Sequence, residues 1–95
     1  MFTMDDARMA LDRLGLDLET EKITLEALTA GMNVELEHGS RFPDLNVSGD
    51  DPIISAQIAL AHLREFPDYY ERLVRMEAEA ETAMAYATDS DLGIT

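Results

Sequence analysis

Two short segments contain the only two histidines of the chain, and each histidine lies three residues from a glutamate. The first segment reads Glu-Leu-Glu-His and ends at His38, and the second reads His-Leu-Arg-Glu and begins at His62. Imidazole nitrogens and carboxylate oxygens are ligands for Zn, Fe or Mn, and residues three apart on a helix project to the same side. If both segments are helical, they predict a site for one such ion, with the candidate ligands Glu35, Glu37, His38, His62 and Glu65.

A second interpretation of the same residues needs no metal. Both histidines can hydrogen-bond to carboxylates or to the backbone at a helix junction of a small acidic bundle. The full di-iron pattern needs two Glu-x-x-His motifs and two further glutamates, whereas one of the two motifs here runs in reverse order. A single ion and a purely structural role therefore both stay open.

The stretch from Asp44 to Gly49 reads Asp-x-Asn-x-Ser-Gly, like the opening of a calcium-binding EF-hand loop. The twelfth position of such a loop needs a bidentate glutamate, and Ser55 stands there. We therefore expect Asx turns that lead into a helix N-cap at Asp51.

Signatures of common enzymes are missing from the sequence. It has no Gly-rich phosphate loop, no His-Glu-x-x-His, no cysteine nucleophile and no Gly-x-Ser-x-Gly. The sequence therefore favours a protein without catalytic activity. The alternative is a metal-binding protein or a metal-dependent hydrolase that uses the two-histidine, glutamate-rich site.

The composition limits the partners. The chain has 95 residues, room for one domain, with 20 acidic and 7 basic residues and a formal net charge of -13. This charge repels phosphate backbones and anionic lipids, so we expect neither nucleic acid nor membrane as a partner. No stretch reaches the roughly 18 apolar residues that span a bilayer, and the first residues lack a signal-peptide pattern. We expect a soluble, intracellular protein.

Apolar residues recur at spacings of three and four through most of the chain, which predicts an all-α fold. We expect a compact bundle of three to four helices with a long loop between the second and third. Residues 1–87 would form a single domain, and residues 88–95 would form a disordered tail. The expected helices cover residues 4–14, 25–38, 52–65 and 67–87, and the loop covers 39–50.

Capping residues support these boundaries. Thr3, Thr24 and Asp51 precede the first three helices and can accept hydrogen bonds from their free amides. Gly15 and Gly39 stand where a left-handed residue would end a helix.

The second and third expected helices each have a feature that bears on packing. Gly31 lies inside the second helix, where it either makes room for a neighbouring helix or weakens its own. The third helix is apolar most of the way round, which predicts a central position.

The segment after the third helix combines three aromatic residues with a heptad-like seam. Phe66 and Pro67 interrupt the helical pattern, and the seam then runs from Tyr69 through alanines at its C-terminal end. It is either an internal packing face or a contact between copies. The candidate interface residues are Phe66, Tyr69, Tyr70, Leu73 and Met76.

Three stretches together resemble a known family. Residues 31–39 read G-M-N-V-E-L-E-H-G, residues 50–52 read D-D-P, and residues 58–73 read I-A-L-A-H-L-R-E-F-P-D-Y-Y-E-R-L. This pattern, completed by Met76-Glu77, is similar to that of a small helical domain family of unknown function found in tailed bacteriophages and bacteria. The resemblance covers about residues 2–79 and implies a phage or prophage setting, but no reaction.

Together, the phage setting and the acidity predict a minor virion component or a protein-interaction module. Its partner would be a virion protein or a second copy, in the virion or the host cytoplasm.

Overall fold

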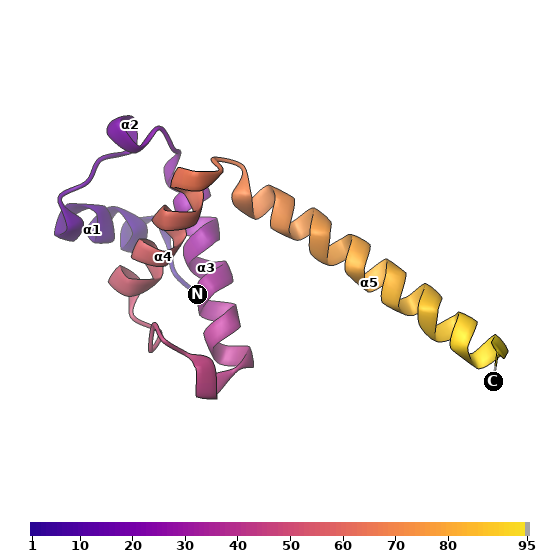
Figure 1. Cartoon of the computed structure of the whole chain (residues 1–95). Helices are drawn as coiled ribbons and strands as arrows, with labels where there is room; N and C mark the ends of the chain where they lie inside the picture. Colours follow the sequence, from indigo (N-terminus) through magenta and orange to yellow (C-terminus); the bar gives the residue numbers. More distant parts are fainter. Residues whose placement is uncertain (95) are drawn as a thin grey trace.

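The computed structural model describes residues 1–94, with side chains described through Ala83 (Figure 1). All secondary structure in residues 1–94 is helical, which confirms the all-α prediction. The first elements form a compact body, and the last helix projects from it, so that the molecule measures 57 × 28 × 19 Å. The elements are α1 (Met4–Leu14), α2 (Leu18–Glu21), α3 (Leu25–Arg41), the 3₁₀ helix η1 (Pro43–Leu45), α4 (Pro52–Glu65) and α5 (Tyr69–Ile94).

Helix α4 lies at the centre of the body, as its apolar character predicts. It packs against α1 and α3, and its C-terminal end meets the start of α5. Alanines on α1 and α4 are fully buried, which lets these helices approach closely. The buried apolar side chains are Ala7, Ala10, Leu11, Leu25, Leu28, Met32, Ala56, Ala59, Leu60, Leu63 and Tyr70.

The predicted N-caps are present. Thr3 and Asp6 form a capping box at α1, in which each side chain accepts from the other residue's amide. The hydroxyl of Thr24 accepts from Ala27 at the start of α3. The carboxylate of Asp51 accepts from two amides in the first turn of α4, which Pro52 opens. These bonds satisfy amides that a helix leaves without internal partners.

The linker between the first two expected helices contains a helix of its own. Asp17 caps α2, and its carboxylate accepts from the amide of Thr20 at 2.7 Å. Glu21, at the end of α2, accepts two hydrogen bonds from Arg64 on α4. Residues 1–94 thus contain five α-helices where the periodicity indicated three or four, because a single capped turn is too short to show a period.

The sequence predicts that the second long helix ends at Gly39, and this prediction is wrong. Helix α3 continues to Arg41, and Gly39 is buried within it. A side chain at Gly39 would collide with the side chain of Asn46. This glycine therefore serves close packing rather than helix termination, and the loop is shorter than expected and contains η1.

Helix α5 begins after the turn at Phe66 and Pro67 and extends past residue 87, the expected end, to Ile94. Residues 88–94 belong to this helix, and residue 95 lies outside the described part. Near the body, Tyr69, Tyr70 and Leu73 pack on the core. From residue 74 to residue 83 every side chain is exposed.

Candidate functional site

The two histidine segments lie on neighbouring helices that run in opposite directions (Figure 1). His38 is in the last turns of α3 and His62 is in the last turns of α4. Because the helices are antiparallel, their C-terminal ends lie at opposite ends of the body. The order of the residues therefore does not bring the two segments face to face.

Tyr70 connects α5 to the first of these segments. Its hydroxyl donates to Glu35 Oε2 at 2.8 Å, and its ring packs against α3. An added Cβ at Gly31 would lie 2.5 Å from Tyr70 Cε2, so this glycine makes room for the ring. Burial, with the Glu35 carboxylate beside it, raises the pKa of Tyr70 far above its ordinary value of 10.0.

The two histidines have different surroundings. His38 Nδ1 lies 3.9 Å from Glu35 Oε1, too far for a hydrogen bond. His62 stacks on Tyr69 with ring centroids 4.1 Å apart and an angle of 3° between the rings. It also meets Tyr70 edge to face at 6.2 Å. Tyr70 thus stands between the two segments, in contact with a residue of each.

The five predicted metal ligands are not gathered into one site. Among the side chains that the structure describes, through Ala83, no group of three from His, Cys, Asp or Glu is arranged to hold a metal ion. Glu37 faces a surface depression that Met1 and Arg41 also line, and Glu65 is exposed. The metal site stays a prediction, and the described geometry gives it no support.

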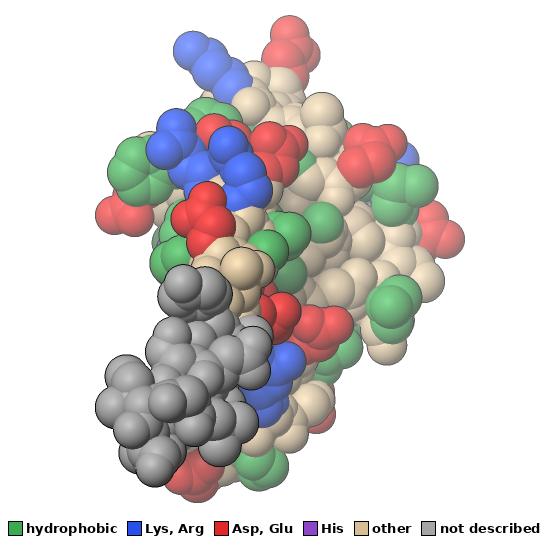
Figure 2. All heavy atoms as spheres, turned by 90° about the vertical axis from the view of Figure 1, so that its right-hand side faces the viewer, with side chains coloured by type: hydrophobic (Ala, Val, Ile, Leu, Met, Phe, Trp, Pro, Cys, Tyr) green, Lys and Arg blue, Asp and Glu red, His purple; other side chains and the backbone are tan. Residues whose placement is uncertain are grey.

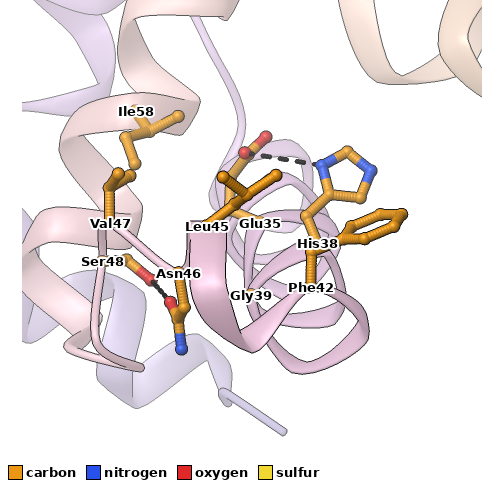
Figure 3. Close-up of a pocket in the computed structure, with 9 residues that line it drawn as sticks. All are labelled: Glu35, His38, Gly39, Phe42, Leu45, Asn46, Val47, Ser48 and Ile58. Carbon is orange, nitrogen blue, oxygen red and sulfur yellow. Dashed lines mark hydrogen bonds and ion pairs between the residues drawn. The ribbon is translucent and has the colours of Figure 1, made fainter.

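A pocket of about 310 Å³ opens beside Glu35 (Figure 3). We call it the Glu35 pocket. Glu35 and His38 from α3 supply its charged and titratable groups. Phe42, Leu45 and Val47 from the loop supply apolar walls, together with Ile58 of α4. Gly39, Asn46 and Ser48 complete the lining.

The loop that forms one wall is held by its own polar residues. Asn46 Oδ1 accepts from the hydroxyl of Ser48 at 3.1 Å and from the amide of Gly49 at 3.0 Å. The Asn46 amide group donates to Asp50 at 3.1 Å. These are the Asx-type turns expected in place of a calcium loop, and they lead to the N-cap at Asp51.

The walls of this pocket did not enter the sequence-based list of functional residues. Phe42, Leu45 and Val47 lie in a segment whose Gly, Pro, Asp and Asn content indicated only a loop. Their signal was the presence of three large apolar residues in an otherwise polar stretch. All three are exposed, which a purely structural loop would not require.

The predicted interface residues divide into two groups. Phe66 and Met76 are exposed, whereas Tyr70 is buried and Tyr69 and Leu73 are half-buried on the core. The aromatic cluster therefore anchors α5 to the body. On the face seen in Figure 2, apolar side chains are interspersed with acidic and basic ones. No helix in residues 1–94 combines the length and apolar character needed to cross a membrane.

One comparison with known proteins gives a match. The family described as "Protein of unknown function (DUF5661)" matches residues 7–79. This range includes most of α1, all of α2 to α4 and the first part of α5. No curated protein and no solved structure matches the chain.

Proposed function

The chain belongs to the DUF5661 family of proteins of unknown function, and from this premise we propose that it is a non-enzymatic protein-interaction module that binds through α5. The observation that carries the proposal is the position of this helix. It leaves the body after Leu73, and its side chains from residue 74 to residue 83 are all exposed. A helix of this kind buries little apolar surface of its own, so a partner helix would stabilise it.

The exposed part of α5 keeps an apolar face. Met76, Ala80 and Ala83 continue the seam that Tyr69 and Leu73 begin at the body. The spacing alternates between four and three residues, as in helices that pair along a seam. Alanine in such a seam allows close approach of a second helix, because its side chain is short.

The partner that fits this face is a second copy of the chain. The two arginines of α5, Arg72 and Arg75, precede Glu77, Glu79 and Glu81 along the helix. In an antiparallel pair, the arginines of one copy would lie beside the glutamates of the other. Opposite charges beside the seam favour this orientation.

Light scattering during gel filtration tests the proposal over a range of protein concentrations. The wild type should increase in mass toward a dimer as its concentration rises. Ala80→Glu places a charge on the seam and should keep the chain monomeric. Ala78→Glu places the same charge two residues away, off the seam, and should leave association unchanged. A wild type that stays monomeric at every concentration, or equal behaviour of the two variants, would contradict pairing through α5.

The phage setting belongs to the same proposal and rests on the sequence resemblance alone. In that setting the module is a minor component of the virion, or acts in the host cytoplasm before assembly. Mass spectrometry of purified particles and of the lysate distinguishes these locations. Absence of the chain from both samples of an infected culture would remove the phage setting and leave the pairing test unaffected.

A further inference from the structure

We propose that the Glu35 pocket binds an arginine side chain that projects from an apolar segment of a partner protein. Glu35 supplies the anion, and the loop supplies the apolar walls. This site lies on α3, η1 and α4, away from the exposed seam of α5. It goes beyond the proposed pairing of α5 and can be tested without it.

The carboxylate of Glu35 is nearly buried, with its side chain 12% exposed. Its Oε2 atom accepts from the hydroxyl of Tyr70 at 2.8 Å. For Oε1, the nearest ion-pair partner in the described part of the chain is His38, at 3.9 Å. Since a buried carboxylate is stable only with donors or a cation close by, Oε1 has capacity for a charged donor from outside.

Glu35 is also held in place before any ligand arrives. Tyr70, which donates to it, is buried and fits against Gly31 without room to shift toward α3. Asn46 fixes the opposite wall through its bonds to Ser48 and Gly49. A preformed site loses less free energy to ordering when a ligand binds.

The shape of the pocket favours a guanidinium over an ammonium. A guanidinium is planar, stacks on aromatic rings and donates to a carboxylate from a fixed fork of N–H groups. Phe42 and Glu35 both line this pocket, and Figure 3 shows His38 beside them. The aliphatic part of an arginine side chain can then contact Leu45 and Ile58.

The surroundings of the pocket favour a protein segment over a small cation. Leu45 and Val47 on its rim are 69% and 83% exposed. A small cation would leave these side chains in water, whereas apolar residues next to the arginine would cover them. The net charge of -13 also attracts a basic partner and repels an acidic one.

Titration followed by ¹⁵N NMR tests the site with capped peptides. The probe is Ac-Ala-Leu-Arg-Leu-Ala-NH₂, and the control peptide has glutamate in place of arginine. The arginine peptide should shift the amides of Gly39, Asn46 and Val47, and the glutamate peptide should leave them unchanged. Shifts confined to other surfaces, or equal shifts with both peptides, would overturn the proposal.

Two matched variants identify the anion. Glu35→Gln keeps an oxygen that accepts from Tyr70 but removes the charge, so it should weaken binding about tenfold or more. Glu37→Gln removes a charge from the same helix outside this pocket and should change binding less than about twofold. Equal losses in both variants, or unchanged binding in Glu35→Gln, would contradict the role of Glu35.

A third variant and a small probe complete the test. Phe42→Ala leaves the Glu35–Tyr70 contact intact, and it should weaken the arginine peptide severalfold by removing the aromatic wall. Thermal unfolding by circular dichroism verifies that each variant is folded. N-Ethylguanidinium should bind at least tenfold more weakly than the peptide, because it does not cover the rim. Equal affinity would identify a small cation as the ligand and overturn the choice of a protein segment.

Discussion

The body formed by α1 to α4 and the projecting part of α5 are both helical, but different interactions hold them. In the body, each long helix is covered by others, and its caps and glycines fit particular neighbours. In α5, the side chains from residue 74 to residue 83 are exposed, and the described hydrogen bonds there are local to the helix. The body is therefore stabilised by tertiary packing, while the projecting helix has its own helical propensity and, in the pairing proposed above, a partner helix.

Substitution of a buried residue should separate the two regions most clearly. Leu28→Ala removes a side chain with no exposed surface and should lower the free energy of unfolding by about 2–5 kcal/mol. Val74 on α5 is 61% exposed, so Val74→Ala should change the free energy of unfolding by less than about 0.5 kcal/mol. Urea unfolding of both variants, at a concentration where the wild type is monomeric, measures the difference. Comparable losses would show that α5 is part of the core.

The glycine at the contact between the two regions should give the next largest effect. Helix propensity alone predicts that Gly31→Ala stabilises α3 by about 1 kcal/mol. The added Cβ would lie 2.5 Å from the buried ring of Tyr70, so we expect a net loss of about 1–3 kcal/mol instead.

The control for this prediction is the same substitution in a Tyr70→Leu background. Without the Tyr70 ring, Gly31→Ala should lower the free energy of unfolding less than it does in the wild-type background. Urea unfolding of the four proteins gives the coupling energy. A stabilising Gly31→Ala in the wild type would mean that α5 does not pack on α3 as closely as the structure shows.

Much of the body could be predicted from the sequence because its signals are local. The cap residues Thr3, Thr24 and Asp51 act within three or four positions, and Gly15 ends α1 in the left-handed conformation as expected. Gly39 has the same residue type as Gly15 and a different role, which depends on a contact with Asn46. Contacts across the fold leave no local pattern, so a rule based on neighbours in sequence cannot distinguish the two glycines.

The candidate site shows the same limit. The sequence indicated Glu35 and His38 as functional candidates, and both line the Glu35 pocket. It grouped them with His62 because the two segments mirror each other, but mirrored order does not determine distance. Tyr70, which links the segments, was assigned to an interface because aromatic residues often occupy one. Only its burial and its bond to Glu35 reveal a structural role.

A smaller, pH-dependent effect should come from Tyr70. Its raised pKa means that the folded state binds the phenol proton more tightly than the unfolded state does. The stabilisation from this difference is complete below the ordinary pKa of 10.0 and declines as the pH rises above it. Wild-type stability should therefore fall above about pH 10, and Tyr70→Phe should reduce that slope.

Urea midpoints measured between pH 8 and 11 test this expectation. Tyr69→Phe is the matched control and should keep the wild-type slope, because Tyr70 is still present. If Tyr70→Phe lost as much stability at alkaline pH as the wild type does, Tyr70 would not be the group that responds to pH.

The smallest expected effect is a difference in stability between the loss of an ion pair within the body and the loss of an ion pair at the start of α5. Arg64 donates two hydrogen bonds to Glu21, which lowers the pKa of Glu21 and ties α4 to α2. The Glu21 side chain is 8% exposed. Arg72 pairs with Asp68 one turn away, and the Asp68 side chain is 40% exposed. Because the first pair is better shielded from water and links distant segments, Arg64→Ala should lower stability more than Arg72→Ala at pH 7.

The pH dependence of this difference has a definite sign. A carboxylate with a lowered pKa contributes stability above its ordinary value of 4.5, and that contribution is lost as the pH falls through the lowered pKa. The difference in stability between wild type and Arg64→Ala should therefore narrow as the pH falls below 4.5. Thermal unfolding at pH 7 and at pH 3 measures it. A gap that persists unchanged at pH 3 would assign the effect of Arg64 to its aliphatic packing rather than to the charge of Glu21.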